Sequence, residues 1–162
     1  EWVGDQVTTA LKAVIPPPIV LLICGLLMWL TDRLASSFYF EVPYRNILFW
    51  VFLLGGLSVF ALGVANILMR KTTIHPDRRS LAEPTALVKT GIFRYTRNPI
   101  YLGMATILVA WVIFLQNWLT VLGVIVFVGF ITEYQIKPEE EALGKIFGKQ
   151  YAEYKNRVRR WL

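Results

Sequence analysis

The chain has 162 residues, which leaves room for one domain. Hydrophobic residues make up 56% of it and charged residues 17%, against roughly 45–50% and about 25% in a typical soluble domain. This composition excludes an ordinary soluble protein and indicates an integral membrane protein. One cysteine, Cys24, and one histidine, His75, exclude a disulfide within the chain and a zinc or haem site built from soft ligands. We therefore expect no metal.

Four apolar stretches follow one another along the chain. The first begins at Pro16-Pro17-Pro18, which suits the start of a helix, and the second holds no charged residue. Because a membrane helix needs about 20 apolar residues, all four are predicted spans. Only Gln116-Asn117 separates the last two, which must form a tight helical hairpin. The spans cover approximately residues 14–30, 46–69, 100–115 and 118–134.

Two features of the first two spans have simple structural interpretations. Cys24 in the first span is expected to be a small buried side chain. In the second span, Ala61 and Ala65 have the spacing of small residues at a close helix contact, within one molecule or between two, so the oligomeric state stays open. The small-residue surface expected to pack there consists of Gly55, Gly56, Ser58, Ala61, Gly63 and Ala65. A secretory signal in residues 1–30 is disfavoured, because its start is acidic and no cleavage site follows.

Basic residues lie almost entirely on one side of these spans. Residues 1–13, 70–99 and 135–162 share a face that holds fifteen Lys and Arg, whereas the opposite face holds only Arg33 and Arg45. The positive-inside rule therefore predicts that both termini and the long loop are cytoplasmic. Anionic headgroups attract such charge, so the basic balance indicates membrane lipids as partners and not nucleic acid.

The tail contains a predicted amphipathic helix. Lys137-Pro138 precedes three glutamates, whose negative charge favours the positive end of a helix dipole. Apolar residues then recur at helical spacing, so one helix is expected, lying on the bilayer or packed on the protein. These residues are Leu143, Phe147, Tyr151, Tyr154, Val158 and Trp161.

Two polar clusters meet at the cytoplasmic end. The first surrounds Pro99 at the start of the third span and contains Arg94, Tyr95, Arg97, Asn98 and Tyr101. The hairpin returns Glu133 and the acidic run 139–141 to the same face. Opposite charges at the mouth of a helix bundle indicate a functional site, although the spacing alone names no reaction.

Three ordered blocks resemble a known family. They are GIFRYTRNPIYLG at residues 91–103, EEEAL at 139–143 and FGKQYAEY at 147–154. Together they resemble the isoprenylcysteine carboxyl methyltransferases, in a superfamily of integral membrane methyltransferases that also includes phospholipid N-methyltransferases. The resemblance covers residues 85–162, the expected methyltransferase core. Residues 1–84 hold the first two spans and the start of the loop, and the whole chain is expected to form one membrane domain.

This resemblance implies a fold and a cofactor. The fold is all-α, with four transmembrane helices and a C-terminal amphipathic helix that caps a cytosolic pocket. The pocket binds S-adenosylmethionine and releases S-adenosylhomocysteine. A cationic donor suits the cofactor's carboxylate, and a protein carboxylate suits its ammonium and ribose hydroxyls. The positions implied to line it are Thr85, Ala86, Leu87, Val88, Phe93, Arg97, Asn98, Pro99, Ile100, Tyr101, Glu139 and Glu140.

The resemblance also bears on catalysis and on the methyl acceptor. Glu140, Tyr101 and Arg97 are the catalytic candidates. Asn98 and Thr85 replace histidines of the family, and Gln135 stands where prenylcysteine enzymes carry the arginine that binds the substrate carboxylate. A lipid or hydrophobic small molecule with a nitrogen, sulfur or oxygen nucleophile is therefore the expected acceptor, with Gln135 and Glu133 beside it.

Glu140, Glu133 and Tyr101 all remain candidates to take a proton from the acceptor, and His75 is expected in a surface loop.

Two alternative functions also remain open from the sequence. A membrane reductase of related architecture would bind NADPH instead. A noncatalytic adaptor would bind anionic lipid through its basic loop and tail, with an affinity that falls smoothly as salt rises.

Overall fold

A computed structural model describes residues 15–73 and 87–162. These residues form helices connected by short 3-10 turns, and no strand occurs among them. The expected all-α class is therefore confirmed for the described part of the chain. The helices are α2 (Pro17–Leu34), α3 (Arg45–Thr73), α4 (Pro99–Leu115), α5 (Val121–Ile131), α6 (Lys137–Phe147) and α7 (Lys149–Arg157). The 3-10 turns are Ser36–Phe38, Gly91–Arg94 and Trp118–Thr120, and a π-helical segment, Thr132–Ile136, joins α5 to α6.

Three helical segments are long and apolar enough to cross a membrane: Pro17–Leu34, Arg45–Met69 and Trp118–Phe147. Helix α4 is also apolar but has 17 residues. Large apolar side chains point outward from the long helices, and Leu22, Leu54 and Ile125 are 70%, 57% and 60% exposed. Such a surface suits a hydrocarbon environment.

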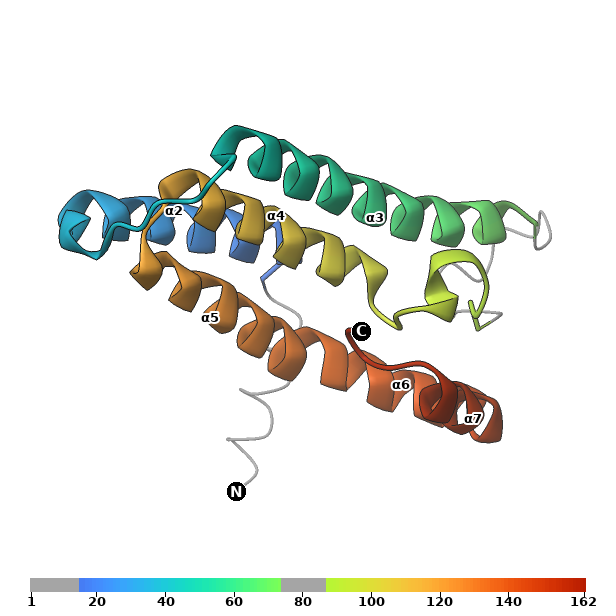
Figure 1. The fold of residues 1–162 in the computed structure, drawn as a ribbon. Helices are drawn as coiled ribbons and strands as arrows, with labels where there is room; N and C mark the ends of the chain where they lie inside the picture. The colour runs from blue at the N-terminus through green and yellow to red at the C-terminus, as the bar shows by residue number, and fades with distance from the viewer. Residues whose placement is uncertain (1–14, 74–86) are drawn as a thin grey trace, which may run out of the picture.

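Helix α4 lies at the centre of the bundle, between α3 and α5 (Figure 1). Its buried side chains join those of α2 and α5 in one apolar core, to which Cys24 also belongs, as expected. The Trp111 indole N–H of α4 donates to the Gly25 carbonyl of α2 at 3.1 Å. The start of α4, which carries the candidate site, is thus fixed by neighbours on several sides.

Glycines allow α3 and α4 to approach closely. A Cβ on Gly56 would lie 2.8 Å from the Gly103 carbonyl oxygen, and a Cβ on Gly103 would lie 2.6 Å from the Gly56 carbonyl oxygen. A Cβ on Gly63 would lie 2.9 Å from the Ile100 side chain of α4. The close helix contact expected on the small-residue surface of α3 is therefore confirmed. It uses Gly56 and Gly63 of that surface, while Ala61 is exposed.

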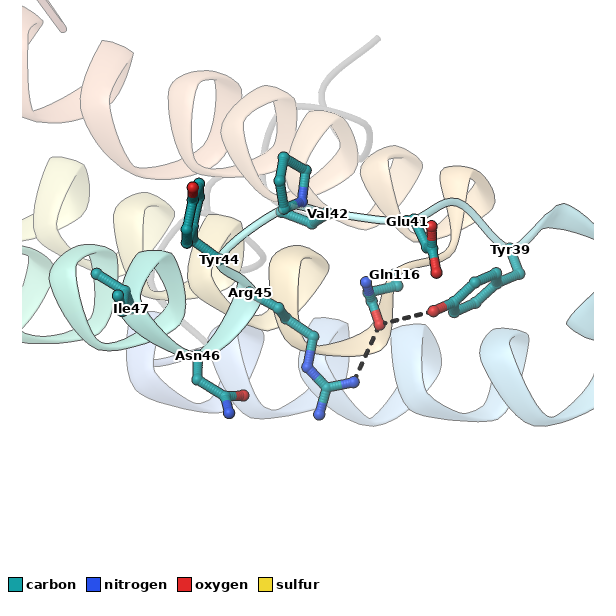
Figure 2. A pocket seen from close by; sticks show the side chains of 9 residues that line it. Tyr39, Glu41, Val42, Tyr44, Arg45, Asn46, Ile47 and Gln116 are labelled. Carbon is teal, nitrogen blue, oxygen red and sulfur yellow. Dashed lines mark hydrogen bonds between the residues drawn. The ribbon is translucent and has the colours of Figure 1, made fainter.

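The predicted hairpin at Gln116-Asn117 is confirmed. Gln116 ends α4 in the left-handed region, with φ at 54°, and the Asn117 side chain accepts from the Leu119 N–H. Figure 2 shows Tyr39 and Arg45 directed at the Gln116 amide oxygen, with donor–acceptor distances of 3.1 and 3.0 Å. A cavity of about 870 Å³ opens beside them. It contains no residue proposed from the sequence for cofactor or acceptor, so the candidate site lies elsewhere.

The predicted start of the tail helix at Lys137-Pro138 is confirmed, since α6 begins there with proline in its first turn, but the predicted separation of this helix from the fourth span is wrong. Helix continues from α5 through the π-helical segment into α6, so Pro138 stands inside one long helical segment. Proline lacks an N–H and clashes with the carbonyl four residues earlier. The wider turn makes room for it: the Lys137 N–H bonds to the Thr132 carbonyl, five residues earlier.

The single tail helix expected from the apolar stripe is also wrong. Gly148 has φ at 47° and divides the stripe between α6 and α7, and Val158 is extended at the end of α7. Tyr151, Tyr154 and Val158 are buried in a cluster that also contains partly buried Leu87, Leu143 and Phe147. A periodic pattern does not reveal such a break, because glycine fits a helix but also permits positive φ.

The contact between α3 and α4 predicts different outcomes for two adjacent glycines. Gly56→Ala should destabilise the protein by about 1–3 kcal/mol, because the added methyl group meets backbone atoms that cannot move independently. Gly55→Ala should be neutral or stabilising by up to about 1 kcal/mol, because nothing lies within 4 Å and alanine is the better helix former. Thermal unfolding in detergent measures both, and equal effects would contradict the proposed packing.

Candidate functional site

Glu140 lies at the centre of an ion network at the start of α6. Its carboxylate is 8% exposed and accepts two hydrogen bonds from Arg160, through Nε at 2.9 Å and Nη2 at 2.8 Å. Arg97 Nη2 lies 3.2 Å from Glu140 Oε1, and Lys155 Nζ lies 3.9 Å from Oε2. The hydrogen bond to Glu140 raises the pKa of Arg160 above its ordinary value. Because several cations share one carboxylate, the cluster carries excess positive charge.

Arg97 has donors that no described residue pairs with. Its side chain is 8% exposed, and Nε and Nη1 are buried without a hydrogen-bond partner in residues 15–73 and 87–162. A buried donor left unpaired costs about 1–3 kcal/mol, and more when it is charged. A guanidinium group presents its donors as a planar fork that matches a carboxylate or a phosphate. The arrangement therefore suits an anionic ligand beside Arg97.

Tyr101, in the first turn of α4, and Glu139, the residue just before Glu140 in α6, form a second polar contact. The Tyr101 hydroxyl donates to Glu139 Oε1 at 2.6 Å. Glu139 is more exposed than Glu140, so its carboxylate remains accessible from outside. Together with the contact between Arg97 and Glu140, this bond joins the start of α4 to the first turn of α6. The expected meeting of the two polar clusters therefore occurs.

Residues 158–161, the C-terminal strap, cross the segment that precedes α4. The Arg97 N–H donates to the Arg159 carbonyl at 3.0 Å, and the Asn98 amide donates to the Arg160 carbonyl at 2.9 Å. The Trp161 indole N–H reaches the Thr132 hydroxyl at 3.2 Å. These bonds hold Arg160 against Glu140. Figure 1 shows the C-terminus beside the start of α4.

Helix α7 packs on the loop that leads to Arg97. The Tyr154 hydroxyl donates to the Phe93 carbonyl at 2.7 Å, and burial raises the pKa of Tyr154 to about 12. The phenol is therefore protonated at neutral pH and remains a donor. Burial, with the nearby Glu140 carboxylate, also raises the pKa of Tyr151. Phe93 itself is buried, and Leu87 contacts the same cluster.

The other cofactor positions implied by the resemblance have varied surroundings. Thr85 and Ala86 lie outside the described residues, as does His75, and Val88 is half-buried. Pro99 and Ile100 pack against the position of Gly63 on α3, so both fix the start of α4. The Asn98 side chain holds the strap. Pro99, Ile100 and Asn98 therefore have structural roles, and their part in cofactor binding stays a prediction.

The two residues expected beside the acceptor make contacts of their own. Glu133 forms an ion pair with Lys137, which lies one turn farther along the helix, and both side chains are exposed. The Gln135 amide donates to the Ile15 carbonyl, before α2, at 3.2 Å. Neither residue has a recorded hydrogen bond to Arg97, Tyr101 or Glu139. Their assignment to the acceptor stays a prediction.

Sequence reasoning missed the most important partner of Glu140. In the sequence, Arg160 and Lys155 are two of six Lys and Arg residues between positions 145 and 160, and their spacing does not distinguish them from the others. Both lie within ion-pair distance of Glu140. Thr96 was also missed; it is 1% exposed and bonds to the strap through its hydroxyl. The tail holds many cations, and only the fold determines which of them faces the acidic run.

Comparisons with known proteins agree with this organisation. Residues 47–150 match the family model described as phospholipid methyltransferase. The match confirms the resemblance to the membrane methyltransferase superfamily and extends it into α3. An uncharacterized protein of Haemophilus influenzae (strain ATCC 51907 / DSM 11121 / KW20 / Rd) is 48% identical over 62 residues, which cover 38% of this chain and 98% of that relative. The match and the apolar helices indicate an integral membrane protein.

The ion network predicts a specific role for Arg160. Arg160→Ala should destabilise the folded protein by roughly 1–3 kcal/mol and loosen the strap, because it removes both hydrogen bonds from a buried carboxylate. Hydrogen exchange at the Arg97 amide, which bonds to the strap, measures the loosening. Arg159→Ala is the matched control: it removes the same charge from an exposed side chain and keeps the carbonyl that bonds to Arg97. Equal exchange rates in both variants would contradict the assigned role.

Proposed function

Since the chain belongs to the phospholipid methyltransferase family, we propose that it transfers a methyl group from S-adenosylmethionine to a membrane lipid. The family match supports methyl transfer in a membrane, and the cluster around Arg97 supports a ligand site. The proposal commits to this cofactor and to a lipid acceptor that carries a nucleophilic nitrogen. Donor and acceptor would meet near the start of α4 and the first turn of α6.

The unpaired donors of Arg97 carry the proposal. The methionyl carboxylate of S-adenosylmethionine has the charge and shape to accept from Nε and Nη1, which are buried and have no partner in the described part of the chain. Glu139, joined to Tyr101, offers a carboxylate for an ammonium or ribose hydroxyl. Phe93 and Leu87 provide aromatic and aliphatic surface near the same loop. The residues present therefore fit the cofactor.

The roles of the chain's own residues follow from these contacts. Arg97 would bind the cofactor's carboxylate, while Glu140 and Arg160 would hold Arg97 in position. Glu140 is a weaker candidate than Glu133 to take a proton, because guanidinium groups already engage both of its oxygens. The Tyr101 hydroxyl carries its own proton, which it donates to Glu139, so it is a weak candidate as well. The cofactor supplies an electrophilic methyl group on a sulfonium. The protein needs mainly to align donor and acceptor and to exclude water.

The proposed topology has four spans, with α4 as the short third one. Both termini and the cofactor site would lie in the cytosol, in accord with the fifteen basic residues on that side. The cofactor would enter from the cytosol and the lipid from the bilayer between helices. Helix α7 and the strap would close the site from the cytosolic side, which the bond between Tyr154 and Phe93 supports.

Binding of S-adenosylhomocysteine tests the cofactor site. Arg97→Ala and Glu139→Ala should each weaken binding about 10- to 150-fold, the equivalent of roughly 1.5–3 kcal/mol for a charged hydrogen bond. Titration calorimetry on detergent-purified protein measures the affinity, and circular dichroism checks that helicity is kept. Lys149→Ala on α7 is the control, because its side chain is exposed, whereas Lys155 lies near Glu140. Unchanged binding in both site variants would contradict the shared site.

The acceptor is tested by product analysis. Membranes that contain the protein are incubated with labelled S-adenosylmethionine, and label is expected in extracted phospholipid that bears an amine. Robust methylation of a prenylated cysteine analogue would contradict the acceptor class inferred from Gln135. Saturable NADPH binding without S-adenosylhomocysteine binding would favour a reductase, and binding of neither would favour an adaptor.

A further inference from the structure

A second charged hollow lies beside the candidate site. It has a volume of about 340 Å³ and is lined by Lys89, Arg94, Glu153, Tyr154, Arg157 and Val158. We propose that it binds a phosphate group, carried by an anionic phospholipid headgroup or present as a soluble ion. This proposal does not depend on methyl transfer. It assigns a ligand to residues that lie outside the set implied to hold the cofactor.

The charge around the hollow points to an anion. Lys89, Arg94 and Arg157 face one carboxylate, Glu153, and none of these four side chains forms an ion pair within the described residues. Glu153 and Arg157 are four residues apart on α7, the spacing at which helical ion pairs form, yet they remain separate. Three cations and one carboxylate leave the lining with a net positive charge, which a bound anion would compensate. Two of the cations are arginines, whose planar fork suits phosphate oxygens.

The position of the hollow connects it to the candidate site. Arg94 ends the 3-10 turn and stands three residues before Arg97, while Arg157 ends α7 and stands three residues before Arg160. Tyr154 lines the hollow and also donates to the Phe93 carbonyl. A phosphate held between Arg94 and Arg157 would link the two segments that carry Arg97 and Arg160. Its binding should therefore stabilise the network around Glu140.

Native mass spectrometry of the detergent-purified full chain tests the proposal. Phosphatidylglycerol and phosphatidylcholine are titrated separately, and inorganic phosphate is titrated in a parallel thermal-unfolding series. We expect phosphatidylglycerol to bind at least about tenfold more tightly than phosphatidylcholine, which has the same phosphate but carries a compensating cation. Protection by inorganic phosphate alone would support the site and identify a soluble ion as its ligand.

Two matched double variants distinguish binding in the hollow from attraction of anions by the overall positive charge of the protein. Arg94→Ala with Arg157→Ala should reduce phosphate or phosphatidylglycerol affinity at least about tenfold. Lys149→Ala with Arg159→Ala removes the same charge from exposed positions outside the hollow and should change affinity less than about twofold. Equal losses in the two double variants would overturn the proposal, as would equal binding of the two lipids without any effect of inorganic phosphate. Unchanged helicity by circular dichroism shows that both variants fold.

Discussion

The arrangement at the end of the bundle where α4 begins depends on one buried carboxylate. Glu140 holds Arg97 from the loop before α4 and Arg160 from the C-terminal strap, so three segments distant in sequence meet at a single group. A buried carboxylate without partners would be costly, and these contacts compensate it. The same contacts leave two nitrogen atoms of Arg97 without a hydrogen-bond partner among the described residues. One interaction thus accounts for the closure of the fold and for the position of the guanidinium group that we propose binds the cofactor.

The helix bundle supplies the rigid support that this network needs. Gly56 and Gly103 bring the backbones of α3 and α4 together, and the core of α2, α4 and α5 fixes the other side of α4. Arg97 stands two residues before α4 begins, so its position is set by a helix that cannot move freely. The π-helical segment supports α6 in a similar way. It accommodates Pro138, so the helix that carries Glu140 continues directly from α5.

Much of the fold was predictable because its signals are local. Long apolar runs give spans, and the two polar residues Gln116-Asn117 require a hairpin. The hairpin in turn brings the acidic run near Arg97, which made the candidate cluster predictable. The break at Gly148 and the continuity through Pro138 were not, since both residues are compatible with more than one backbone conformation.

Sequence by itself determined the all-α class, the membrane character and the family, because each is a property of composition, periodicity or ordered motifs. Only the tertiary structure decided which charges pair. Fifteen basic residues lie on one side of the predicted spans, and nothing in their spacing singles out Arg160 as the partner of Glu140. That choice follows from the fold-back of α7 and the path of the strap, which bring residue 160 beside residue 140 and leave Arg94 and Arg157 around a separate hollow. Pairing depends on distance in space, which a one-dimensional pattern does not contain.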